Sequence, residues 1–269
     1  MIGLAPCWAI TPESISGKTD MAKQALKTTT PAPHSLNIDG ERVAIVVTIN
    51  RRARRIILKV DGLERLIQVT CPGKSYQREA LAFVKERKAW IADRLAEAPA
   101  RRPFAPGEII PVGGEPHLIA HAPGKRIGVR VQPATGSNPA VITVGGDANF
   151  VARKITDWLR QTAREKLTQE TDKFCKVLNK RRRKVSVRDG RTRWGSCSSD
   201  GSLCYSWRLI LAPPAVLSYV AAHEVSHLIH LDHSAKFWAV VDKICDNRKS
   251  AERWLTTKGP SLYGYGVAF

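Results

Sequence analysis

Hydrophobic positions form short alternating runs in the first half of the chain. Three β-branched runs at residues 43–48, 56–60 and 66–69 are separated by turn-forming segments, which predicts a small antiparallel meander. Apolar residues then recur every three or four positions over residues 80–95, which predicts a helix that ends before Pro99. Four further apolar runs, set among glycines and prolines in residues 105–145, predict two more hairpins.

A helical period dominates the second half. One apolar face extends along residues 155–178 and predicts a long helix, followed by strands at 185–187, near Trp194 and at 203–210. Another helix begins at residues 213–214, and no internal repeat is evident. The pattern predicts an α+β protein with three parts: a flexible leader (1–38), a β-rich N-terminal region with one helix (39–148) and an α+β domain (149–269).

Composition narrows the class of protein. The chain has 43 Lys+Arg against 24 Asp+Glu, a formal charge of +19, yet 43% of its residues are hydrophobic. This balance predicts a folded protein with a positive field rather than a disordered polycation. The 6 cysteines are scattered and are interpreted as reduced thiols. Without a long apolar run, no membrane span is expected, and we predict a cytoplasmic location.

The segment H-E-x-x-H at residues 223–227 lies inside the helix predicted from residue 213. Histidines four residues apart lie one above the other, so His223 and His227 can ligate one Zn²⁺ at about 2.0–2.1 Å. Glu224 can then reach a water on the metal. Chance would produce this motif in about one such chain in a hundred, so two surface histidines on an amphipathic helix are the weaker interpretation.

A catalytic zinc needs a third protein ligand, and two histidines are candidates. His230 continues the helix face but lies about 10 Å along the axis from His223. His233 lies beyond the predicted helix end, where a turn can bring it back to the metal, and we favour it. His230 stays as the alternative ligand or as a donor to an oxyanion.

These parts predict amide hydrolysis, with Glu224 accepting a proton from water and delivering it to the leaving amine. Tyr219 shares the helix face of His223 and is a candidate to stabilise the oxyanion, although core packing is the commoner role of such a tyrosine.

Further segments accompany the histidine motif. They are R-W-G-S-C at 193–197, W-R-L at 207–209, H-S at 233–234, F-W at 237–238, P-G-x-S at 72–75 and K-x-W-I at 88–91. Together they resemble the YgjP-like metallopeptidases, relatives of the SprT-like zinc proteases, over most of residues 40–257. The chain departs from the family pattern at Ser206 and at residues 245–247.

The resemblance implies a zincin-like catalytic domain that acts on a protein or peptide substrate. It implies zinc ligands His223, His227 and His233, with Glu224 as general base. It also places R-W-G-S-C in the sheet beside the catalytic helix, where an edge strand can pair with an extended peptide. An equally weighted interpretation is a packed hairpin in which Trp194 is core and Gly195 forms a bulge.

The basic run at residues 180–184 raises a competing hypothesis. Arg181, Arg182 and Arg183 are either a solvated face or contacts to nucleic-acid phosphates. In the second case the protein is a basic nucleic-acid-binding protein with a structural or vestigial zinc site, or a protease acting on nucleic-acid-bound proteins. A structural site is normally closed by four protein ligands, which favours the peptidase. The sequence does not indicate the oligomeric state.

Overall fold

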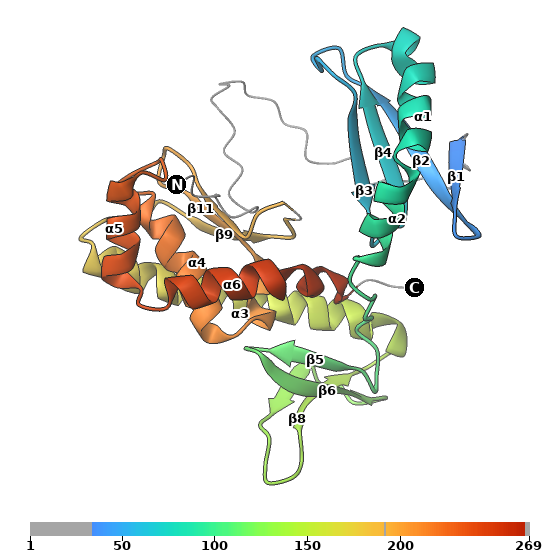
Figure 1. Ribbon diagram of the computed structural model, residues 1–269. Coiled ribbons are helices and arrows are strands. Elements are labelled where there is room, and N and C mark those ends of the chain that lie inside the picture. The colour runs from blue at the N-terminus through green and yellow to red at the C-terminus, as the bar shows by residue number, and fades with distance from the viewer. Residues whose placement is uncertain (1–33, 191, 267–269) are drawn as a thin grey trace. The chain divides into compact units, whose positions relative to one another are not determined.

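The computed structural model describes residues 34–190 and 192–266 (Figure 1). The described residues form two compact units, which divide between Ala100 and Arg101. We refer to residues 34–100 as the N-terminal unit and to residues 101–266 as the C-terminal unit. Both combine strands with helices, so the predicted α+β class is confirmed. None of the helices formed by the described residues is long and apolar enough to cross a lipid bilayer.

The N-terminal unit is a four-stranded sheet covered by two helices. Its elements are β1 (His34–Ile38), β2 (Glu41–Ile49), β3 (Ile57–Asp61), β4 (Leu66–Cys71), the 3-10 turn η1 (Lys74–Tyr76), α1 (Gln77–Glu86) and α2 (Lys88–Ala96). The strand order is β1-β2-β4-β3, in which only β2 and β4 are parallel. Ile67 and Val69 of β4 are fully buried with Ala80 and Val84 of α1, because alternate strand residues and every fourth helix residue face each other.

Three predictions for this unit need correction. The predicted antiparallel meander does not form, because β2 pairs in parallel with β4, and β3 lies at the sheet edge beside β4. Residues 34–38 were assigned to a flexible leader but form β1, whose hairpin with β2 turns at Asp39 and Gly40 with positive φ at both. This two-residue turn is the type that suits the twist of a hairpin. The rest of the predicted leader lies outside the described residues. The predicted helix is divided at Arg87 into α1 and α2.

The C-terminal unit begins with a second four-stranded sheet. Its strands are β5 (Ile109–Val112), β6 (Glu115–Ala122), β7 (Val129–Gln132) and β8 (Ala140–Gly145), in the order β5-β6-β8-β7. The 3-10 turn η2 (Ala148–Phe150) leads into α3 (Val151–Val177), the long helix that the apolar period predicts.

The sequence places a division near residue 149, whereas the compact units divide 48 residues earlier in the chain, between 100 and 101 (149 − 101 = 48). The reason is a shared core. Ile142 and Val144 of β8 are buried in one cluster with Ile155 and Leu159 of α3, and the same cluster continues into the last helices of the chain. The second sheet therefore belongs to the unit that carries the H-E-x-x-H helix.

The remainder of the C-terminal unit is a small sheet with helices around it (Figure 1). Antiparallel β10 (Gly195–Cys197) and parallel β9 (Val185–Arg188) flank β11 (Leu203–Ser206), so β10 is an edge strand. The elements that follow are η3 (Trp207–Leu211), α4 (Pro214–Ser226), α5 (Ala235–Ile244), α6 (Arg248–Thr257) and η4 (Gly259–Gly264).

A buried arginine ties the end of the C-terminal unit to its core. The Arg208 side chain is 8% exposed and forms a bidentate ion pair with Asp189, with N–O distances of 2.7 and 3.2 Å. Its Nη1 also donates to the backbone oxygens of Leu262 and Tyr265, both at 2.8 Å. The guanidinium lies over the rings of Trp207 and Tyr263. A charge this deep is stabilised because each of these groups satisfies it.

Candidate metal and catalytic site

The helix α4 carries the H-E-x-x-H motif inside the core. Pro213 caps it and Pro214 opens it, a position where a missing backbone N–H removes no helical hydrogen bond. Every residue from Tyr219 to Ser226 is buried, so this part of the helix is enclosed by the core on all sides. His223 is 1% exposed and Glu224 is 2% exposed. Burial of two polar side chains on such a helix is typical of a functional site.

The chain reverses direction just after the motif. His227 is the C-cap of α4, and the amides of Ile229 and His230 both bond to the Ser226 carbonyl oxygen, at 3.0 and 3.1 Å. This tight turn ends the helix and lets His233 return toward it. Ser234 then caps α5 by accepting from the amide of Phe237.

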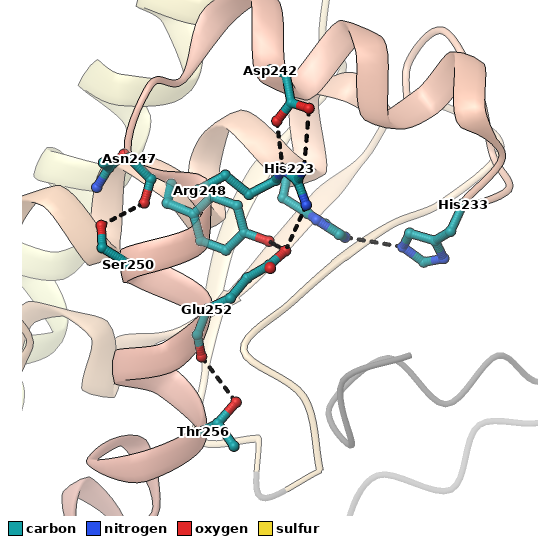
Figure 2. Close-up of polar contacts among 9 residues, drawn as sticks. His223, His233, Asp242, Asn247, Arg248, Ser250, Glu252 and Thr256 are labelled. Carbon is teal, nitrogen blue, oxygen red and sulfur yellow. Dashed lines mark hydrogen bonds and ion pairs between the residues drawn. The ribbon is translucent and has the colours of Figure 1, made fainter. Parts of the chain in front are cut away.

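Three imidazoles meet at this reversal. The ligand nitrogens of His223, His227 and His233 all lie within 4.8 Å of one another. Nε2 of His233 is 3.1 Å from Nε2 of His223, the contact drawn in Figure 2. Nitrogens that share one tetrahedral zinc at 2.0–2.1 Å stand about 3.3 Å apart, so the donor set fits such an ion.

The protonation of these imidazoles favours metal binding. Burial, and then the charges of the two other histidines, hold the pKa of His223 well below its usual range. Burial also lowers the pKa of His227 and of His233. Nδ1 of His227 is 2.9 Å from the backbone oxygen of His230, which favours a proton on Nδ1 and a lone pair on Nε2. All three rings are therefore neutral donors near neutral pH.

Aromatic side chains of α5 fix the planes of the imidazoles. The ring of Phe237 stacks on His227 with centroids 4.5 Å apart, and the ring of Trp238 stacks on His233 with centroids 5.6 Å apart. Phe237 also meets His223 edge to face. Because these rings limit imidazole rotation, the three nitrogens stay directed at one point.

Glu224 follows His223 in α4, and its side chain is buried. Burial raises the pKa of its carboxyl group to about 8, while the positive charge of Arg193 acts in the opposite direction. A carboxyl group with a pKa near the working pH is suited to both accepting and returning a proton.

Two alternatives named from the sequence have other roles. The described residues contain one group of three or more metal-ligating side chains, and His230 is outside it; its backbone oxygen instead orients His227. The Tyr219 hydroxyl donates to Oε1 of Glu252 at 2.8 Å, so it is engaged with α6. Its ring packs edge to face on His223, which is the packing role expected as the commoner one.

A charged cluster of Asp242, Arg248 and Glu252 on α5 and α6 lies behind the aromatic rings that pack on the histidines (Figure 2). It was not identified from the sequence. Arg248 forms a bidentate ion pair with Asp242 and lies 3.7 Å from Glu252. Its guanidinium also covers the ring of Trp238 at 5.0 Å. Arg248 of this cluster contacts Trp238, which stacks on His233. Glu252 accepts a hydrogen bond from Tyr219, which packs on His223. The only sequence signal was the helical spacing of Arg248 and Glu252.

The R-W-G-S-C segment combines features of both interpretations made for it. Trp194 is buried and stacks on Tyr263, as a core residue. Gly195 pairs in regular register with Tyr205, so the predicted bulge does not form. β10 nevertheless lies at the sheet edge and contacts α4.

The predicted nucleic-acid contacts lie in the loop between α3 and β9. Arg182 forms a bidentate ion pair with Asp172 of α3, and Arg183 pairs with Asp200. Arg181 is exposed. Nucleic-acid binding by these residues stays a prediction, and two of the three guanidinium groups are already next to a carboxylate.

Comparison with known proteins gives one match. A family model described as YgjP-like, metallopeptidase domain, matches residues 54–258, which is more than half of the chain and includes the H-E-x-x-H helix and His233. The match extends across parts of both compact units. No curated protein and no solved structure matches the chain.

Proposed function

The chain belongs to the YgjP-like metallopeptidase family, and we propose that it is a zinc-dependent enzyme that hydrolyses peptide bonds. The metal ligands in this proposal are His223, His227 and His233. Glu224 is the general base. The observation that carries the proposal is the convergence of three neutral imidazole nitrogens within 4.8 Å, next to a buried carboxyl group.

The choice of zinc rests on the donor set. Three imidazoles leave an open fourth position, which is the arrangement of catalytic rather than structural zinc sites. When bound, zinc supplies a positive charge that makes water acidic near neutral pH and polarises a peptide carbonyl.

The residues of the chain then carry the proton. Glu224 accepts it from the attacking water at a carboxylate oxygen and later delivers it to the nitrogen of the leaving amine. Burial raises the pKa of its carboxyl group, which makes it a stronger base than an exposed glutamate.

An extended peptide is the substrate that suits this site best. β10 is an edge strand that contacts α4 and pairs only with β11 among the strands of the described sheet. Its other edge offers backbone groups to a substrate strand, which is the usual way in which a sheet edge holds a peptide.

Metal content and hydrolysis test this function together. We expect about one zinc per chain by elemental analysis in the wild type, a loss of zinc in His233→Ala and no loss in His230→Ala, which is the matched control. Glu224→Gln should keep the metal and lose casein hydrolysis by at least about a hundredfold. A metal-free wild type, or hydrolysis indifferent to Glu224→Gln, would contradict the proposal.

A further inference from the structure

The carboxylate of Glu224 lies against the backbone of Gly195 on the edge strand β10. A Cβ atom at residue 195 would stand 2.4 Å from Oε1 of Glu224, 2.6 Å from its Cγ and 2.7 Å from its Cδ. Real Cβ atoms do not approach other heavy atoms this closely, so any other residue would displace the Glu224 side chain or the strand.

Space, and not backbone conformation, requires the glycine here. The φ angle of Gly195 lies outside the left-handed region, so alanine can adopt the same backbone. The strand is also regular, with Gly195 opposite Tyr205. The three atoms nearest to the Cβ that alanine would add all belong to Glu224.

Two charged or titratable neighbours of Gly195 in the chain interact electrostatically with Glu224. Cys197 is the last residue of β10, and Arg193 lies two residues before the strand begins. The charge of Arg193 lowers the pKa of Glu224, and burial together with the charge of Glu224 raises the pKa of Cys197 to about 12. The Glu224 side chain thus occupies the space that a side chain at residue 195 would fill.

We propose that Gly195 is a positioning residue, whose missing side chain leaves the space against β10 that the Glu224 carboxylate occupies. This inference rests on the proposed function. It assigns to the glycine of R-W-G-S-C a role in catalysis through Glu224 rather than in the turn or the fold.

The first test is the kinetics of Gly195→Ala in the full-length protein. We expect the zinc content to stay that of the wild type, because the atoms nearest to the added Cβ belong to Glu224 and not to a metal ligand. The kcat for peptide hydrolysis should fall about a hundredfold, as expected for a displacement of the base by about 1 Å, with little change in KM. Gly128→Ala is the matched control, because no atom lies within 4 Å of the position of its added Cβ, and its φ is also ordinary. It should behave as the wild type.

The second test needs neither metal nor activity. In chelator-treated protein, Gly195→Ala should lower the urea midpoint of unfolding, because the new methyl group meets Glu224. In a Glu224→Ala background, which removes Cγ, Cδ and both carboxylate oxygens, the same substitution should cause little loss. This double-mutant cycle isolates the contact between residues 195 and 224.

The outcomes separate this inference from the proposed function. Equal losses of stability in both backgrounds, or a normal kcat in a zinc-loaded Gly195→Ala protein, would overturn the role of Gly195. If Gly195→Ala does not fold, the double variant must fold, and its failure would also overturn it. Hydrolysis that survives in Glu224→Gln would instead refute the general base, and the stability cycle would still report the contact.

Discussion

The two four-stranded sheets of this protein have the same topology and different uses. Each sheet consists of two hairpins, and the second strand of the first hairpin pairs in parallel with the second strand of the other: β2 with β4 in one sheet and β6 with β8 in the other. A 3-10 turn then leads into a helix. Both first hairpins turn on two residues with positive φ, Asp39 and Gly40 in one and Gly113 and Gly114 in the other. Only the second sheet shares a core with the H-E-x-x-H helix.

Two local differences explain this. The helix after the first sheet ends at Glu86, and its buried residues contact their own sheet and α2. The helix after the second sheet is 27 residues long and also packs against η3 and α4. In addition, the amides of Gly113 and Gly114 donate to the carbonyl oxygens of Ile210 and Leu211, just before α4 begins. The second sheet therefore supports the site because its helix α3 and its first hairpin turn both contact the segment around α4, whereas α1 packs within its own unit.

The largest expected effect comes from matched truncations in the two cores. Ile91 and Ile155 are both fully buried, one in each unit. Ile91→Ala and Ile155→Ala should each cost about 2–5 kcal/mol of stability. In calorimetry, zinc should raise the transition that Ile155→Ala lowers, because a ligand stabilises only the unit that binds it. The transition lowered by Ile91→Ala should not respond to zinc. A single transition affected by both variants would break the comparison.

A smaller difference is expected between the two hairpin turns. Gly40→Ala and Gly114→Ala should each cost about 1–2 kcal/mol, because both residues have positive φ. A Cβ at Gly114 would also stand 3.2 Å from Cα and Cγ of Pro213, the cap of α4, whereas one at Gly40 meets no atom within 4 Å. Gly114→Ala should therefore cost more in urea unfolding and should weaken zinc binding in a chelator competition. Equal costs and unchanged zinc affinity in both would show that the turn does not support α4.

The smallest effect is expected at the surface. Glu41, the residue after the first turn, pairs with Arg65, and both side chains are more than 40% exposed. Glu41→Gln should cost about 0.2–1 kcal/mol, and less at high salt. Neither this variant nor Glu115→Gln, after the second turn, should alter zinc affinity. A change in zinc affinity in either would mean that surface charges, and not the cores, distinguish the two units.

The sequence predicted the parts of this structure that depend on local periodicity. The long helix α3, the start of α4 and the placement of His223, Glu224 and His227 follow from helical spacing alone. The short strands β2 to β8 lie near their predicted positions, because each is a β-branched or apolar run between turn residues. The sequence missed strand β1 because three of its five residues are polar and it follows a segment with no hydrophobic period.

Features that depend on contacts between residues distant in the sequence could not be predicted from local patterns. The return of His233 needs the turn that closes on Ser226, and sequence spacing could only favour it over His230. Gly195 suggested a bulge, since nothing in its neighbours indicates that a carboxylate 29 residues later lies against it (224 − 195 = 29). The two sheets share the same strand pairing but are built from dissimilar side chains. Their similarity is therefore not visible as a repeat in the sequence.

The hydrogen bonds of Arg208 to the end of the C-terminal unit limit how far the chain can be truncated. The family match ends at residue 258, whereas the guanidinium donates to the carbonyl oxygens of Leu262 and Tyr265. A chain trimmed at that limit would retain every histidine and Glu224, yet would leave a buried cation with donors that lack acceptors, which costs about 1–3 kcal/mol for each group. We therefore expect a chain that ends at residue 258 to unfold at a lower urea concentration than one that extends past Tyr265, so an expression boundary should be placed after Tyr265.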